Sequence, residues 1–246
     1  MAADPQAHAA LMVTGQSRLQ SSWPVFDDST SVDALTAAGQ AVLNAPNLSV
    51  AGGVSISGKA AVVPQVKTGS ESDPFAALAV PAASGPPAPA GTANITRSTT
   101  LSPGVYPAGM TVSGSAAVIL RPGVYVLQGG GLAVSSSASV TGAGVVIVLE
   151  PGSASTACGS IAIAGGRVNL AAPDTGPRAG IAVWIDSRCG RASGVTFAGS
   201  SRSSITGALY APAGEMAITG LAKVSATSVV ADRLALSGSG WLTTSP

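Results

Sequence analysis

The sequence predicts an all-β fold, a right-handed parallel β-helix (β-solenoid), from a repeat, its spacing and its internal alternation. The repeat is an apolar residue, a small one, an apolar one, then Ser, Thr or Ala, and then Gly. Neighbouring copies mostly follow one another after about twenty residues, the length of one solenoid coil. Apolar and small residues alternate within each copy, as in a strand that buries one face. Such a coil buries its apolar face only against other coils, which predicts a stack.

The copies occupy much of the chain. They are residues 11–19, 35–43, 54–62, 110–118, 132–140, 161–169, 195–203, 216–224 and 234–242. Each copy has a turn residue expected at a corner of the coil. These corner residues are Gly15, Gly39, Gly58, Gly114, Ser136, Gly165, Gly199, Gly220 and Gly238. A second phrase, Pro-Gly-Val-Tyr, occurs at 103–106 and again at 122–125, and this 19-residue spacing gives a similar coil length.

The repeat predicts one solenoid domain over residues 11–246, preceded by a flexible tail at 1–10. Residues 64–98 form a Pro-rich lateral excursion, because proline cannot donate to the ladder of a central strand. Within it, an N-cap residue at Asp73 followed by Pro74 favours one short helix at 73–78. Regular coils resume near Thr99, and Trp241 is expected to cover the open end of the last coil. The prolines of the excursion are Pro64, Pro74, Pro81, Pro86, Pro87 and Pro89.

Charge is scarce. The 246 residues have a net charge of +1, and charged residues make up 9% of the chain, against about 25% in typical soluble domains. The lack of a basic cluster along the sequence argues against nucleic acid as a partner. No apolar run reaches the ~20 residues of a membrane span. Residues 1–11 lack the charged and apolar regions of a signal peptide.

We expect no cofactor and no metal site. Residues 53–59 match the G-x-x-x-x-G-K pattern of a phosphate-binding loop, but Ala60 stands where that loop needs Ser or Thr. The sole histidine, His8, lies in the expected tail. Cys158 and Cys189 are the only cysteines. Their spacing is compatible with a disulfide and equally with two partly buried free thiols.

A polysaccharide-cleaving β-helix is the catalytic alternative, and it would need two carboxylates about 5–10 Å apart across a groove. Nothing in the spacing of Asp174 and Asp186 favours such a pair, and solvated loop charges, with Asp186 capping a turn, explain the same residues. We therefore assign no catalytic residue. The candidate groups are Asp174, Asp186, Asp232, Arg178, Arg188, Arg191 and Arg202.

A surface adhesin or ice-binding solenoid is a further alternative, because a regular face of Thr and Ser can match an ordered lattice. The outward positions before the corner glycines vary too much for a repeated Thr ladder. They are Thr14, Ala38, Ser57, Ser113, Ala164, Ala198, Thr219 and Ser237.

Six phrases follow one another along the chain, beginning with ALTAAGQAVLNAPNLSVAGGVSISGKAAV and SDPFAAL and ending with VVADRLALSG. They lie at 34–62, 72–78, 101–149, 168–186, 205–220 and 229–238. Their order resembles the C-terminal β-helical region of TadG-like proteins of the Flp (tight-adherence) pilus-assembly system. The resemblance implies an extracytoplasmic, non-enzymatic structural component, in the periplasm or at the cell surface. It transfers no catalytic residues.

We therefore predict a non-catalytic structural and interaction module of the bacterial cell envelope. Its expected partners are other envelope or pilus-assembly proteins, and end-to-end self-association is a second mode. Binding would use exposed strand edges at the ends of the stack or its Ser/Thr-rich faces.

Overall fold

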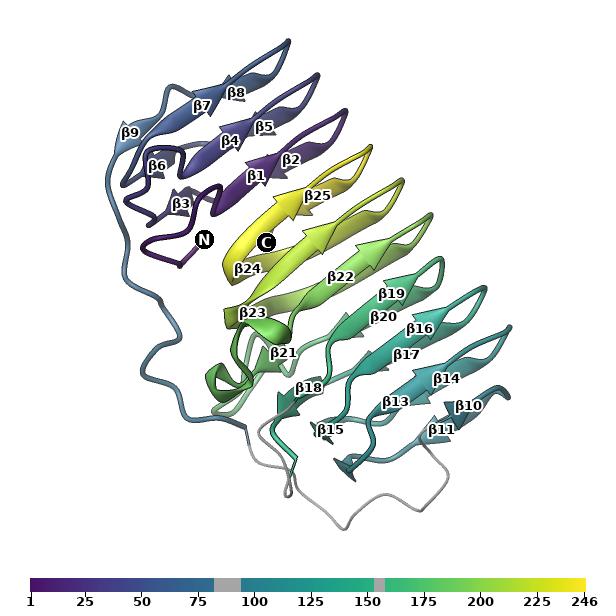
Figure 1. The fold of residues 1–246 in the computed structure, drawn as a ribbon. Coiled ribbons are helices and arrows are strands. Elements are labelled where there is room, and N and C mark those ends of the chain that lie inside the picture. The colour runs from purple at the N-terminus through teal and green to yellow at the C-terminus, as the bar shows by residue number, and fades with distance from the viewer. Residues whose placement is uncertain (82–93, 153–157) are drawn as a thin grey trace.

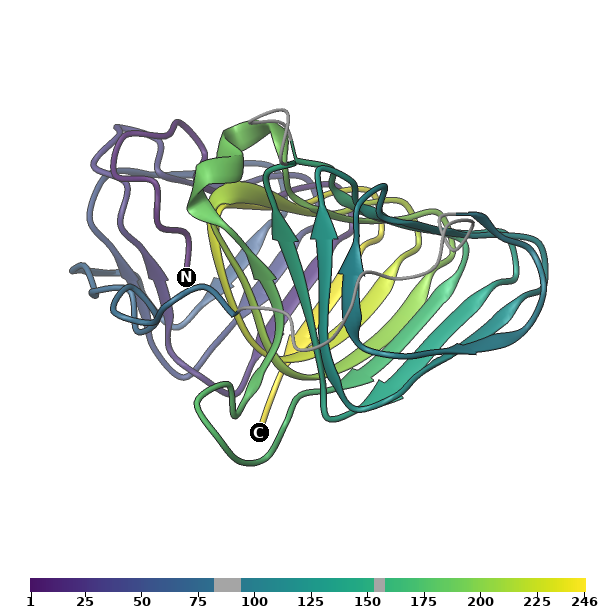
Figure 2. The same ribbon diagram turned by 90° about the horizontal axis from the view of Figure 1, so that it is seen from below.

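The computed structural model describes residues 1–81, 94–152 and 158–246. Within these ranges the chain forms a parallel β-solenoid, and every pairing between its strands is parallel. Figure 1 shows the coils stacked as successive rungs, and Figure 2 shows them wound around one interior. The predicted all-β, parallel β-helical architecture is confirmed.

Each coil has three sides, so the stack has three walls, which we number by the strand of the first coil that each contains. The first wall, from one end of the stack to the other, consists of β7 (Val54–Ile56), β4 (Leu35–Ala37), β1 (Leu11–Val13), the last parts of β24 (Lys223–Leu236) and β23 (Arg202–Ile218), β22 (Val195–Ala198), β19 (Ile161–Ala164), β16 (Leu132–Ser135), β13 (Met110–Val112) and β10 (Asn94–Ile95).

The second wall consists, in the same direction, of β8 (Ala61–Val63), β5 (Val42–Asn44), β2 (Arg18–Ser21), β25 (Trp241–Thr244), the first parts of β24 and β23, β20 (Arg167–Ala171), β17 (Ser139–Ala143), β14 (Ala117–Leu120) and β11 (Thr99–Leu101).

The third wall consists of β9 (Lys67–Thr68), β6 (Leu48–Val50), β3 (Val25–Asp27), the single bridging residue Ala2, the middle parts of β24 and β23, β21 (Ile181–Ile185), β18 (Val145–Glu150), β15 (Gly123–Gln128) and β12 (Gly104–Tyr106). A short 3-10 helix, η1 (Ser187–Ala192), follows β21.

The residues predicted at the corners have left-handed backbone conformations. The eight corner glycines have φ between 64° and 81°, and Ser136 has φ 61°. Some corners also approach each other closely: a Cβ on Gly15 would lie 2.7 Å from the carbonyl oxygen of Gly238. Glycine is therefore required there both by its backbone angle and by lack of space.

Inward-facing aliphatic side chains form one core along the stack. In β1, for example, Leu11 and Val13 are buried and Met12 between them is partly exposed. The third wall differs, because β18 and β21 are buried on both faces. That double burial explains the unbroken apolar run at 145–149, since a strand covered on both sides has no need for polar alternation.

The two Pro-Gly-Val-Tyr phrases lie on paired strands, but their equivalent residues are not opposite each other. Gly104 lies opposite Tyr125, two residues beyond the position that the matching phrases suggest. The rings of Tyr106 and Tyr125 nevertheless stack, with centroids 5.8 Å apart, because both side chains point inward. Coil length therefore varies from wall to wall, and the 19-residue spacing does not describe the third-wall pairing.

The chain does not follow the stack in order. Residues 1–68 build one end, and residues 94–246 begin at the other end and return to meet them (Figure 1). At the seam, β1 pairs with β24, with Leu11 opposite Leu234, and β2 pairs with β25, with Arg18 opposite Trp241. The expectation that Trp241 covers an open end is therefore wrong, since the first coil of the chain lies beyond it.

The first residues complete the last coil. Where β25 ends, Ala2 continues the same coil in the third wall and bridges Ala231 of β24 and Asp27 of β3. The N–H of Ala3 donates to the carbonyl of Ala231 at 2.8 Å, and that of Ala2 donates to the carbonyl of Phe26 at 2.9 Å. The expected flexible tail at 1–10 thus contains a rung, which joins two strand edges that would otherwise lie unpaired at the seam.

The Pro-rich excursion covers an apolar outer surface of the third wall. Phe75 lies edge-on to the ring of Tyr210, with centroids 5.3 Å apart, and the Tyr210 hydroxyl donates to the carboxylate of Asp73 at 2.8 Å. Trp184, opposite Tyr210 on the neighbouring strand β21, also packs against its ring, at 4.5 Å between centroids. Residues 64–98 are described only as far as 81 and again from 94, so Pro86, Pro87 and Pro89 lie outside the described residues.

The short helix expected at 73–78 is wrong. The carboxylate of Asp73 accepts a hydrogen bond from the N–H of Phe75 at 2.8 Å, as in a cap, but successive turns follow it instead of a helix. The anchoring of Phe75 and Asp73 to Tyr210 accounts for this, because it fixes the segment against the wall. Across the described ranges, no helix is both long enough and apolar enough to cross a membrane.

Candidate functional site

Cys158 and Cys189 are joined by a disulfide, with their Cα atoms 5.3 Å apart. Cys189 belongs to η1, whose N-cap is Asp186. The carboxylate of Asp186 accepts hydrogen bonds from the backbone N–H and the guanidinium of Arg188, both at 2.9 Å. The disulfide therefore fastens the capped turn at the end of β21 to the segment before β19. The sequence allowed either a disulfide or two free thiols, and the structure contains the disulfide.

The acidic candidates for catalysis lie apart. Asp174 is exposed in the turn before β21, and Asp186 lies at the other end of that strand, which separates them by roughly 16 Å at about 3.3 Å per residue. Burial alone would raise the pKa of Asp186, but the hydrogen bonds from Arg188 outweigh it and hold this pKa below its usual value. Asp186 thus caps a turn, as the sequence suggested, and does not face Asp174 across a groove.

Asp232, the third acidic candidate, belongs to an ionic cluster that fastens the first residues of the chain. The guanidinium of Arg191 contacts the carboxylate of Asp4 and lies 3.3 Å, from Nε to Oδ2, from Asp232. Arg233 Nε is 3.7 Å from Asp4 Oδ2. Burial and the charge of Asp4 raise the pKa of Asp232. The cluster holds Asp4 beside the bridging rung of Ala2 and so fastens the first residues of the chain to the stack.

His8 also lies on the surface of the first coils. Its Nδ1 is 2.6 Å from a carboxylate oxygen of Asp33, and both side chains are exposed. Hydrogen bonds from Ser31 and His8 lower the pKa of Asp33. The stretch that matches a phosphate-binding loop is the corner between β7 and β8, with Gly58 at the turn, and a strand follows it where a nucleotide site would need a helix.

Five exposed residues on successive rungs of the second wall form what we call the basic row: Arg167, Arg202, Lys223, Trp241 and Arg18. Arg202 lies opposite Lys223, Lys223 opposite Trp241, and Trp241 opposite Arg18. The pairing of Asn169 with Ser204 places Arg167 beside Arg202. Side chains one rung apart are about 4.8 Å apart at the backbone, so four cations from distant parts of the sequence meet on one surface.

The indole of Trp241 lies between two of these cations. Lys223 Nζ is 5.3 Å, and Arg18 Cζ 5.8 Å, from the ring centroid. Each contact is worth about 0.5–1 kcal/mol at an exposed position. The two contacts favour positions of the long basic side chains next to the ring.

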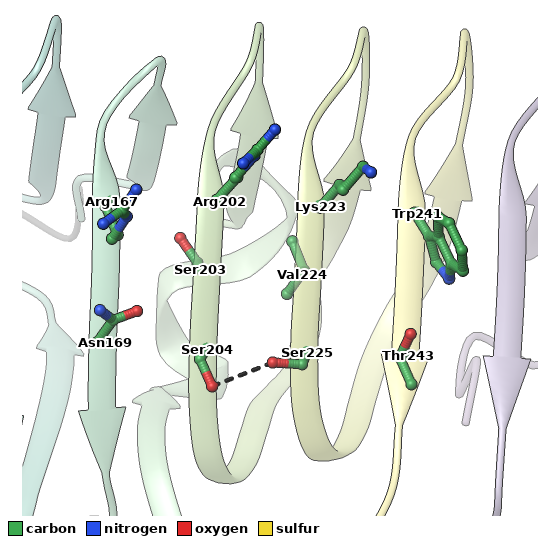
Figure 3. A pocket seen from close by; sticks show the side chains of 10 residues that line it. All are labelled: Arg167, Asn169, Arg202, Ser203, Ser204, Lys223, Val224, Ser225, Trp241 and Thr243. Atoms are coloured by element: carbon green, nitrogen blue, oxygen red, sulfur yellow. Dashed lines mark hydrogen bonds between the residues drawn. The ribbon is translucent and has the colours of Figure 1, made fainter.

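A second line of side chains runs beside the basic row, two residues further along each strand. We call it the polar row, and it consists of Asn169, Ser204, Ser225, Thr243 and Gln20. The hydroxyl of Ser225 donates to that of Ser204 at 3.1 Å. All members of the two rows except Arg18 and Gln20 line a shallow, open groove of about 500 Å³, and Figure 3 shows these side chains projecting from neighbouring strands. Arg18 and Gln20 continue the rows on the next strand, β2.

Sequence reasoning missed the basic row because it searched for cations clustered along the chain. The signal was the phase of the repeat. Four of the five residues stand three positions after a corner glycine, at the same place in different coils. They are Arg18 after Gly15, Arg202 after Gly199, Lys223 after Gly220 and Trp241 after Gly238. A parallel stack brings equal phases of consecutive coils together, so this position predicts that Arg202, Lys223 and Trp241 lie side by side, whereas Arg18 joins them only through the pairing of β2 with β25.

The end of the stack formed by β7, β8 and β9 leaves part of the core open. Val54 and Ile56 face inward, and they are 38% and 51% exposed. Leu35 and Ala37, their partners one coil further in, are 0% and 1% exposed. We call this surface the open end. It combines an apolar surface with a strand edge, the two features that permit addition of another chain.

The outward residues before the corner glycines follow the first wall. Thr14 and Ser237 are neighbours there, because Val13 pairs with Leu236. The positions that follow on the described coils mix Thr, Ser and Ala, so these side chains form no uniform Thr ladder.

Comparison with known proteins adds no relative: no protein-family model, curated protein or solved structure matches this chain.

Proposed function

We propose that the chain is a non-catalytic structural and interaction module of the bacterial cell envelope, with a role like that of a pilus-assembly component. The six phrases that resemble TadG-like proteins support the pilus context. The parallel stack supports the mechanical role, because backbone ladders run along the first and second walls and Ala2 bridges the two parts of the third, which makes a stiff body.

The observation that carries the proposal is the open end. Val54 and Ile56 sit where every inner coil has buried side chains, and the edges of β7 and β8 pair on one side only among the described strands. An apolar end with a free strand edge is unfavourable in water and is satisfied by another chain that adds to it. The proposed partners at this end are other envelope or pilus-assembly proteins, with a second copy of this chain as the alternative occupant.

The disulfide supports an extracytoplasmic location. Disulfides such as Cys158–Cys189 persist in oxidising compartments and are rare in the cytosol, where thiols are kept reduced. The periplasm or the cell surface is therefore the proposed location of the module.

The test uses two variants of equal chemistry. Ile56→Lys places a charge on the open end, and Ile119→Lys places the same charge on the flat second wall, where Ile119 is 55% exposed. The wild-type protein, cross-linked in the envelope of its host and purified, should carry pilus-assembly proteins identified by mass spectrometry. Ile56→Lys should lose them, and Ile119→Lys should keep them.

Two results would contradict the proposal. Capture of no pilus-assembly protein by the wild-type chain would remove the pilus context. Equal capture by Ile56→Lys and Ile119→Lys would show that the open end is not the docking surface. Analytical ultracentrifugation of the same proteins decides the alternative occupant, because end-to-end self-association would shift the wild-type protein, but not Ile56→Lys, to a larger species.

A further inference from the structure

The basic row is a set of like charges that the described residues leave uncompensated. None of Arg18, Arg167, Arg202 and Lys223 forms an ion pair with a described residue. The second-wall strands, as described, contain no Asp or Glu. Like charges on neighbouring rungs destabilise a sheet. A ligand that supplies the missing negative charge would remove this repulsion.

The basic row runs along the axis of the stack, and this arrangement favours an extended ligand. The cations follow the axis of the stack, one rung after another, and from Arg167 to Arg18 the row spans roughly 19 Å, at about 4.8 Å per rung. A small anion would reach one or two of them. An extended chain lying across the strands, with a negative charge at intervals, would reach all four.

The polar row defines the chemistry between those charges. Amide and hydroxyl groups of Asn169, Ser204, Ser225 and Thr243 border the same groove, beside the cations. Gln20, opposite Thr243, extends this line onto the next strand. Neutral donors and acceptors of this kind match a ligand rich in hydroxyl groups. The open, shallow shape of the groove suits a chain that lies on the surface and continues beyond it.

The small number of aromatic residues on the second wall favours an acidic polysaccharide over single-stranded nucleic acid. Single-stranded nucleic acid is bound by stacking successive bases on aromatic side chains. Trp241 is the one aromatic residue in the described second-wall strands, and cations lie against it. One ring held in this way offers no series of stacking platforms, whereas a row of hydroxyls and amides fits sugars.

We propose that the groove between the basic and polar rows binds a linear acidic polysaccharide, carrying carboxylate or sulfate groups, along the axis of the solenoid. Arg167, Arg202, Lys223 and Arg18 hold the negative groups, and the polar row accepts and donates hydrogen bonds to the hydroxyls between them. This site lies on the second wall and is independent of docking at the open end, so each can fail without the other.

The experiment measures binding of the purified chain to polygalacturonate by biolayer interferometry at 20 and 200 mM salt. Binding should be present at low salt and weaken steeply at high salt, because several counterions are released together. The fully methyl-esterified polymer has the same backbone without the charge, and it should not bind. Single-stranded DNA and vesicles of anionic phospholipid serve as the two competing polyanionic surfaces.

Two variants locate the site. Arg202→Gln with Lys223→Gln removes the central pair of cations and should weaken binding by at least about 10-fold, as expected for losing charge-assisted hydrogen bonds. Lys67→Gln removes an exposed cation from β9 of the third wall and should change binding less than about 2-fold, because an isolated surface charge contributes little. Both changes are at exposed positions, and unchanged thermal unfolding verifies the fold.

Several outcomes would overturn the proposal. These are absence of polygalacturonate binding at low salt, equal binding of the esterified polymer, or equal losses in the double variant and in Lys67→Gln. Tighter binding of single-stranded DNA or of anionic vesicles than of polygalacturonate would assign the row to that ligand instead. If the double variant unfolds, Arg202→Gln alone replaces it, with a loss of at least about 3-fold expected.

Discussion

At the residue scale, the corner glycines show two separate reasons why a position requires glycine: a left-handed backbone angle and a lack of space for a Cβ atom. Gly15 and Gly114 have nearly the same backbone, with φ 74° and 70°. A Cβ on Gly15 would meet the carbonyl oxygen of Gly238 at 2.7 Å, whereas one on Gly114 would have no atom within 4 Å. The first corner is therefore limited by both its backbone angle and its neighbour, and the second by the angle alone.

Alanine at the two corners should give different losses of stability. Gly114→Ala should lower the free energy of unfolding by about 1–2 kcal/mol, the cost of left-handed backbone for an L-residue. Gly15→Ala should lower it further, since the seam between Gly15 and Gly238 must also open. Urea unfolding followed by circular dichroism measures both. Equal losses would show that the close approach at the seam relaxes freely.

At the element scale, the excursion acts as a cover. Its Phe75 packs on Tyr210, next to the ring of Trp184, and so covers part of the outer apolar surface of the third wall. The sequence predicted that this Pro-rich stretch lies outside the ladder. It could not show which wall the stretch covers, because Phe75 and Tyr210 are 135 residues apart and neither belongs to the repeat.

Truncation of Phe75, which contacts Tyr210, should lower the stability of the protein, whereas truncation of the nearby Leu78 should not. Phe75→Ala should lower the free energy of unfolding by about 1–3 kcal/mol, from lost apolar burial and the lost ring contact with Tyr210. Leu78, in the same turn, is 43% exposed, and Leu78→Ala should change the free energy by less than about 0.5 kcal/mol. The readout is thermal and urea unfolding. A neutral Phe75→Ala would mean that the segment is not fastened through this ring.

At the scale of the whole molecule, the seam is the main feature that the sequence did not reveal. The repeat identified the rungs, their corners and their inward faces, because each of these is set by residues close together in the chain. It could not give the order of the rungs. Leu11 and Leu234 occupy equal phases of similar phrases, and the pairing rules that join them would equally allow other partners.

Because the repeat does not give the order of the rungs, it also could not predict the complete basic row. Every member of the basic row was visible in the sequence, but Arg18 joins Lys223 across Trp241 only because the first coil stacks on the last. The disulfide was one of two readings, since spacing alone does not bring Cys158 to Cys189. The capping role of Asp186 was predicted, because it depends on Arg188, two residues away.

The seam should hold two separate polypeptides together. Residues 1–81 and 94–246, co-expressed as two chains, should co-purify, because β1, β2 and Ala2 pair with strands of the longer piece. Leu11→Asp in the shorter piece should prevent this, since Leu11 faces the core and is 1% exposed. Met12→Asp, on the outward side of the same strand, should not. Pieces that elute separately without any substitution would contradict the seam.

The two chain ends meet within one coil, and this determines where a polypeptide attached to the C-terminus would leave the solenoid. Met1 and Thr244 line the same small cavity, of about 70 Å³, at the level of the seam. Any polypeptide continuing from Pro246 would emerge from the flank of the rod, part-way along its length. A tether attached there would join the side of the stack and would leave both of its ends free for contacts with other chains.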